Sequence, residues 1–194
     1  ASHNTAIGYN SLLVNTTGAN NVAVGSNALD ANTTASDNVA IGRLALTANT
    51  TGTGNVAIGR DALEANTTAN DNTAVGYDSL KLNTTGTRNV AVGALALTSN
   101  TTASNNVAIG GGTSGVAFAA LQSNTTGQYN TAVGAGGALG ANTTANYNTA
   151  VGYSALLDNT TGTTNTAVGA LALDANTTGS SNTAFGVQAL TANT

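Results

Sequence analysis

The chain has 194 residues, a formal net charge of −4, and only 6% charged residues. Its four cations, Arg43, Arg60, Lys81 and Arg88, are too few to neutralise a track of phosphates, which argues against a nucleic-acid partner. Because cysteine is absent, there is no disulfide framework and no thiolate metal site. No apolar run approaches the length of a membrane span. Low charge combined with many Thr, Val and Ile residues favours an ordered chain.

A 17-residue repeat occupies almost the whole chain. Its first half reads Asn-(Thr/Val)-Ala-(Val/Ile)-Gly, with Phe185 as one exception, and we number each copy from that asparagine. A unit this short cannot enclose its own core, so it must stack on its neighbours. The sequence therefore predicts an all-β fold, a single parallel β-solenoid over residues 1–194. Its eleven coils begin at residues 4, 21, 38, 55, 72, 89, 106, 130, 148, 165 and 182.

The first five positions of each coil predict a strand of four or five residues that ends at the invariant glycine of position 5. Positions 2 and 4 share one face of this strand, and the invariant alanine of position 3 lies on the other. That alanine predicts tight packing, either inside the coil or against another chain. We expect each coil to bury one leucine together with one Val or Ile.

Positions 6 to 11 carry residues that favour helices, and position 9 is leucine in every coil. The segment is too short for a stable helix, so it predicts one helical turn or a tight corner that directs leucine inward. Asn-Thr-Thr-(Gly/Ala) follows at positions 12 to 15, where Asn tolerates a left-handed conformation and Gly can follow. Stacking would align identical residues into Asn and Thr ladders. Gly and Ala alternate at position 15, giving a 34-residue pattern without an evident reason in the sequence.

One insertion interrupts the repeat. Residues 111–119 take the place of positions 6 and 7 in the seventh coil, and the eighth coil carries one extra residue in the same place. Loops that protrude from a rigid scaffold often carry binding residues, and the candidates here are Thr113, Ser114 and Phe118. The alternative, which we favour, is a tolerated surface insertion.

No catalytic, metal or cofactor site can be assembled from the sequence. The only histidine, His3, has no partners for a nucleophilic triad or a metal site. The carboxylates fall at four different coil positions, and the glycine-rich calcium repeat and the nucleotide-binding fingerprints are absent. We therefore expect a protein that is not an enzyme and binds no cofactor.

Asn-Thr-Thr also matches the N-glycosylation acceptor, once per coil. If used, the sites would coat one edge of the rod with covalent glycans. The alternative, which we favour, is that the tripeptide is a by-product of turn chemistry. The ten candidate asparagines are Asn15, Asn32, Asn49, Asn66, Asn83, Asn100, Asn124, Asn142, Asn159 and Asn176.

The strand half of the repeat resembles the head repeat of YadA-type trimeric adhesins. It stands as NVAIG at 38–42, 55–59 and 106–110, and as NTAVG at 72–76, 130–134, 148–152 and 165–169. The whole unit also resembles arrays in tail-fibre-like and bacterial surface-fibre proteins. These resemblances imply a left-handed parallel β-roll, commonly trimeric, that serves as an extracellular stalk or adhesive head. The longer period and the Ala-Leu-x-x-Asn-Thr-Thr half depart from the adhesin motif.

These observations favour a structural or adhesive extracellular fibre module, at a cell surface or on a virion. We expect a homo-oligomer (a trimer or a filament) with a cell-surface or carbohydrate receptor. Because the chain begins and ends in phase with the repeat, we expect a segment of a longer array or a filament subunit. An ice-binding solenoid is the alternative, although neighbouring threonines of an extended Asn-Thr-Thr would point to opposite faces. A carbohydrate-processing β-helix is less favoured, because no coil places two acidic residues side by side.

Overall fold

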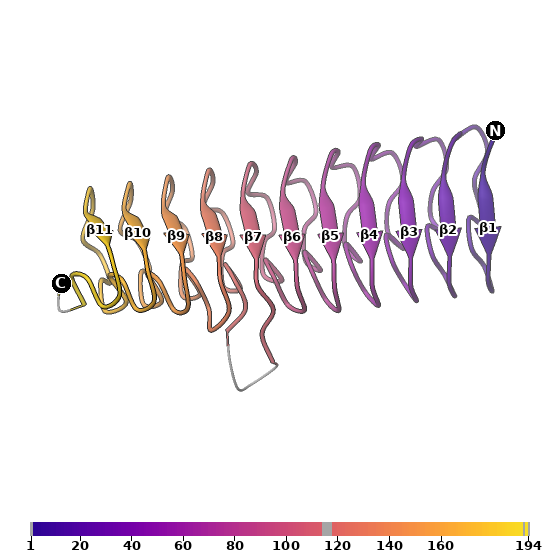
Figure 1. Cartoon of the computed structure of the whole chain (residues 1–194). Coiled ribbons are helices and arrows are strands. Elements are labelled where there is room, and N and C mark those ends of the chain that lie inside the picture. The colour runs from indigo at the N-terminus through magenta and orange to yellow at the C-terminus, as the bar shows by residue number, and fades with distance from the viewer. Residues whose placement is uncertain (1, 114–117, 192, 194) are drawn as a thin grey trace.

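The computed structural model describes residues 2–113, 118–191 and 193, and it forms a parallel β-solenoid. Eleven strands make one parallel sheet in chain order, and the described residues contain no helix, which confirms the predicted fold (Figure 1). The N-terminus lies at the β1 end of the array and the C-terminus at the β11 end. The strands are β1 Thr5–Ile7, β2 Val22–Val24, β3 Val39–Ile41, β4 Val56–Ile58, β5 Thr73–Val75, β6 Val90–Val92, β7 Val107–Ile109, β8 Thr131–Val133, β9 Thr149–Val151, β10 Thr166–Val168 and β11 Thr183–Phe185.

The strands pair in a register that places identical coil positions side by side. Ala40 of β3, for example, pairs with Ala23 of β2 and Ala57 of β4. Each strand has three residues rather than four or five, because the glycine of position 5 leaves the extended conformation. A Cβ on Gly25, whose φ is +134°, would lie 2.5 Å from the carbonyl oxygen of Gly42 in the next coil. Only glycine fits this stacked corner.

The interior of each coil is narrow and contains small side chains. In the third coil, Ala40, Ala45 and Leu46 are fully buried, and most other coils bury the same positions. This confirms the interpretation that the position-3 alanine packs inside its own coil. The prediction that each coil also buries one Val or Ile is wrong, because positions 2 and 4 point outward. Ile41 is 39% exposed, and Val39 is only partly buried.

The corner that carries leucine is a tight turn without helical geometry. The position-9 leucines have φ values between +50° and +53° in every coil, and position 7 is usually left-handed as well. A left-handed residue other than glycine costs about 1–2 kcal/mol, whereas burying a leucine side chain contributes about 1.5–3 kcal/mol. Burial therefore compensates for this conformation. The third left-handed position is position 17, so the prediction that the asparagine of position 12 and the glycine of position 15 take this role is wrong.

Two columns of asparagine form the predicted Asn ladders. At position 1, the Oδ1 of Asn38 accepts the backbone N–H of Asn55 at 2.9 Å, and Asn55 Nδ2 donates to the Ala69 carbonyl at 2.8 Å. At position 12, Asn66 Nδ2 donates to Asn49 Oδ1 at 3.0 Å and to the same Ala69 carbonyl at 3.1 Å. The asparagines of both ladders are fully buried throughout the middle of the rod. They satisfy one another along the axis, as buried polar groups must.

The 34-residue pattern has a structural explanation in the backbone hydrogen bonds. In the third coil, which has Gly52 at position 15, Thr50 and Thr51 both donate N–H to the Thr67 carbonyl, at 2.9 and 3.3 Å. In coils with Ala at position 15, the second threonine donates no such bond within the part of the chain that the structure describes. A Cβ on Gly52 would lie 2.3 Å from the Ala69 carbonyl oxygen, so alanine does not fit here.

Position 16 follows the same alternation. In the third coil, the N–H of Thr53 donates to the Asn70 side chain of the next coil at 2.7 Å. Four other pairs of coils repeat this contact, and the acceptor is always Ser or Asn. The structural unit is therefore a pair of unlike coils. The acceptors are Ser36, Asn70, Ser104, Asn146 and Ser180.

Candidate interaction surfaces

The outward face of the sheet is an uncharged surface that runs along all eleven strands. We define this outward sheet face as positions 2 and 4 of every coil, which hold only Thr, Val, Ile and Phe185. Its isoleucines are exposed, as shown by Ile58 (37%) and Ile109 (40%), and its valines are partly buried. The strands β1 to β11 lie side by side in one parallel sheet (Figure 1), and their pairing in register aligns these positions into two columns. The position-4 column is apolar along its whole length, and an exposed apolar surface of this kind is typical of an interaction site.

The ten candidate glycosylation asparagines form the position-12 ladder. Asn15 is partly buried, and the nine from Asn32 to Asn176 are fully buried. Their Nδ2 groups donate to neighbouring carbonyl oxygens, as Asn66 does at 3.0 and 3.1 Å. A glycan on Nδ2 would replace one of these donors and place a sugar in the filled interior. The buried position of these asparagines therefore favours the interpretation that Asn-Thr-Thr forms the turn and the ladder and is not a glycosylation site.

Within Asn-Thr-Thr, the two threonines have different environments. The first is partly buried in most coils, and its hydroxyl donates to the next coil, as Thr50 Oγ1 does to the Thr67 carbonyl at 3.1 Å. The second threonine, such as Thr51, is exposed in all ten coils. Asn-Thr-Thr therefore presents a single exposed column of threonine hydroxyls.

The insertion leaves and rejoins the rod without disturbing the stack. Gly112 donates to the Ala94 carbonyl at 2.9 Å and Ala120 donates to the Gly110 carbonyl at 3.0 Å, as the equivalent residues do in other coils. Of the candidate binding residues, Thr113 is exposed, Phe118 is 46% exposed, and Ser114 lies outside the described residues. A Cβ on Gly137 would lie 2.5 Å from the Cβ of Phe118, so the glycines of the eighth coil make room for this side chain.

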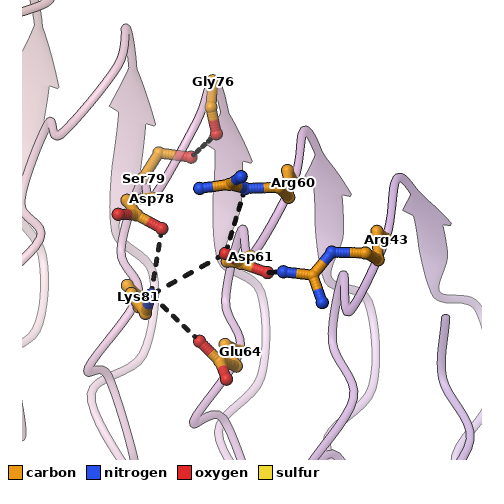
Figure 2. A network of polar contacts seen from close by, with 8 residues as sticks. All are labelled: Arg43, Arg60, Asp61, Glu64, Gly76, Asp78, Ser79 and Lys81. Carbon is orange, nitrogen blue, oxygen red and sulfur yellow. Dashed lines mark hydrogen bonds and ion pairs between the residues drawn. The ribbon is translucent and has the colours of Figure 1, made fainter. Parts of the chain in front are cut away.

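A cluster of charged side chains lies on coils three to five (Figure 2). At its centre is Asp61, whose side chain is only 6% exposed. Its carboxylate lies 3.3 Å from Arg43 Nη2, 3.2 Å from Arg60 Nε and 3.8 Å from Lys81 Nζ. Lys81 also contacts Asp78 at 3.1 Å, and in addition it contacts Glu64. Three cations thus balance three carboxylates, and the cluster joins adjacent coils.

The environment of Lys81 changes its affinity for a proton. Partial burial acts to lower the pKa of Lys81, but hydrogen bonds and Coulomb attraction from Asp78 and Glu64 outweigh burial and raise it. The cluster therefore holds Lys81 in its charged form. Its six members come from three successive coils, so the whole cluster can be found only by placing the coils in register.

Exposed aromatic side chains gather on coils seven to nine. Tyr129 and Tyr147, both at position 17, stack with ring centroids 5.1 Å apart and an interplanar angle of 2°. Tyr153, at position 6 of the ninth coil, is 60% exposed, and a Cβ on Gly136 would lie 2.5 Å from its Cε2. The tyrosines therefore lean toward the preceding coil on both sides of the sheet.

Among the residues that the structure describes, no group of three or more His, Cys, Asp or Glu side chains is placed to hold a metal ion. His3 is exposed at the N-terminal end of the rod. Over the same residues, no helix is long and apolar enough to cross a membrane.

Comparison with known proteins gives no relative: no protein-family model, curated protein or solved structure matches the chain. The structure therefore shows the fold of the chain but no family. The chain is a parallel β-solenoid of eleven strands about 17 residues apart.

Proposed function

We propose that this chain is a non-catalytic, extracellular fibre module, in which several copies associate into a rigid rod at a cell surface or on a virion. The outward sheet face is the observation that carries this proposal. Val, Ile and Thr side chains cover it along all eleven strands, and no charged residue interrupts it. Burial of this apolar surface between copies is favourable by roughly 25 cal/mol per Å².

The construction of the rod supports a role in spacing and display. Every coil is joined to the next by strand pairing, by two asparagine ladders and by the threonine hydroxyls. Each coil contacts only its neighbours, so the array can be lengthened by adding pairs of coils. Surfaces outside the outward sheet face, such as the exposed threonine column of Asn-Thr-Thr, then remain for a cell-surface or carbohydrate receptor.

The test combines light scattering after size exclusion with electron microscopy of the purified chain. We expect a multi-chain, rod-shaped particle. Ile58→Lys places a charge on the outward sheet face and should shift the particle toward monomer, whereas Thr51→Lys, an exposed substitution elsewhere on the coil, should leave the assembly unchanged. A wild-type chain that stays monomeric at high concentration would refute the proposal.

An ice-binding solenoid is a second candidate, and the outward sheet face is also the observation that favours it. The face presents β-branched side chains in two regular, uncharged columns on a pleated sheet. The single exposed threonine column of Asn-Thr-Thr does not supply a double row. Thermal hysteresis separates the two functions, because an ice-binding face must stay uncovered in the active form.

A further inference from the structure

We infer that copies of this chain dock in parallel and in register, with the amino edge of the sheet in one copy against the carboxyl edge in the next. The amino edge is the column of position-17 residues that precede the strands, and the carboxyl edge is the column of position-6 residues that follow them. This inference rests on the proposed fibre function. Beyond that function, it specifies which edges of neighbouring copies meet and which residues set their axial register.

The register needs an explanation because the outward sheet face repeats. A shift of one coil, about 4.8 Å, would replace each apolar side chain by an almost identical one. Such uniform strands specify their register weakly, and proteins use polar or aromatic residues at single positions to remove the ambiguity. Only residues that break the 17-residue repeat can do this here. Beside the outward sheet face, such residues lie on the two edges.

The charged residues of the two edges are complementary. The carboxyl edge carries Arg43 and Arg60, both about half exposed, and the amino edge carries Asp37 and Asp71, both exposed. An Asp71 oxygen lies only 2.7 Å from where a Cβ on Gly54 would be, so this carboxylate leans back toward the third and fourth coils.

The two arginines lie at the same axial level as that carboxylate. Both guanidinium groups contact Asp61 of the fourth coil (Figure 2), and Arg60 also covers the Tyr77 ring at 4.4 Å. In the in-register arrangement, Asp71 of one copy therefore faces the Arg43–Arg60 pair of the next. Arg88, the one cation of the amino edge, faces the uncharged Tyr77 and Ala94 of the carboxyl edge.

Aromatic residues give an independent match further along the rod. Tyr147 precedes β9 on the amino edge and Tyr153 follows the same strand on the carboxyl edge. They are 59% and 60% exposed, and both lean toward β8: Tyr147 stacks on Tyr129, which precedes β8, and Tyr153 lies against Gly136, which follows it. In register, Tyr147 of one copy meets Tyr153 of the next. A shift of two coils could bring Asp37 to the arginines, but it would separate the tyrosines.

Cysteine pairs can measure this register because the chain has no native cysteine. Thr164→Cys with Ala170→Cys reports docking in register, Thr164→Cys with Val187→Cys reports a shift of one coil, and Ser181→Cys with Ala170→Cys reports the opposite shift. Residues 164 and 170 lie on opposite sides of β10 and are six residues apart along the chain, a span of up to roughly 20 Å at about 3.3 Å per residue. Disulfides need Cα atoms closer than about 7 Å, so any bond must join two chains.

We expect the 164/170 pair to give inter-chain cross-links, by mild oxidation or a short bismaleimide, in several-fold higher yield than either shifted pair. In this background, Asp71→Lys or Tyr147→Ser should lower the yield several-fold. Asp158→Lys, an exposed acid away from both edges, should leave it unchanged, with circular dichroism confirming the fold of each variant.

The outcomes separate the two proposals. If light scattering shows a monomer, the fibre function and this inference both fail. If an oligomer forms but a shifted pair or Thr164→Cys alone cross-links best, the fibre function stands and the in-register edge pairing is overturned. If 164/170 cross-links best and neither Asp71→Lys nor Tyr147→Ser lowers its yield, the assignment of the register residues is wrong.

Discussion

Gly86→Ala tests the pairing of unlike coils most directly. The substitution would give three successive coils alanine at position 15, an arrangement that the sequence never uses. The new Cβ would lie 2.1 Å from the Ala103 carbonyl oxygen and 2.5 Å from Asn83 Oδ1. Both atoms belong to the fixed interior of the stack, so the coils would have to separate locally.

We expect Gly86→Ala to destabilise the rod by about 1–3 kcal/mol, the usual cost of overpacking a filled interior. The sign of the change in unfolding free energy is informative. At an unstrained site Gly→Ala stabilises a protein by about 0.4–1 kcal/mol, because alanine lowers the conformational entropy of the unfolded chain. Ala103→Gly is the matched control. It creates neighbouring glycine coils, as Gly162 and Gly179 already are, and should cost only about 0.5–1 kcal/mol.

The measurement is urea unfolding followed by far-ultraviolet circular dichroism on both variants under conditions that keep the same oligomeric state. If Gly86→Ala is neutral or stabilising, or no worse than Ala103→Gly, the alternation does not arise from the contact with the next coil. The explanation of the 34-residue pattern would then be wrong.

Further predictions concern the core, the ladder and the charged cluster. Leu80→Ala should cost about 2–5 kcal/mol in unfolding free energy, whereas Leu82→Ala, at a side chain that is 48% exposed, should change it little. Asn66→Ala leaves buried ladder partners unsatisfied, which should cost about 1–3 kcal/mol; a neutral result would show that the ladder does not stabilise the stack. The pKa of Lys81 is raised on folding, so its contribution is complete below the unfolded pKa of about 10.4 and is lost as pH rises through the higher folded pKa. Lys81→Met should remove that alkaline loss of stability in pH-dependent melts, and an unchanged profile would contradict the role of Lys81.

Repetition made much of this fold predictable. Equivalent positions of neighbouring coils lie above one another, so a residue type found in every coil must pack against its own copy in the next coil. This requirement explains glycine at position 5 and leucine at position 9. The asparagine ladders follow from the same rule. The charged cluster around Asp61 was not found from the sequence, although aligning positions 6, 7 and 10 of successive coils would have brought its members together.

By itself, the sequence determined that the chain stacks 17-residue coils, where each strand ends and that leucine points inward, since a short unit can be stable only through its neighbours. Which face of the sheet lies inside was decided by the tertiary structure. Strand alternation separates alanine from Val and Ile but does not say which is buried. The leucine of the left-handed corner occupies the narrow interior of the coil, so the strand turns its small alanine inward, and this leaves Val and Ile on the outward sheet face.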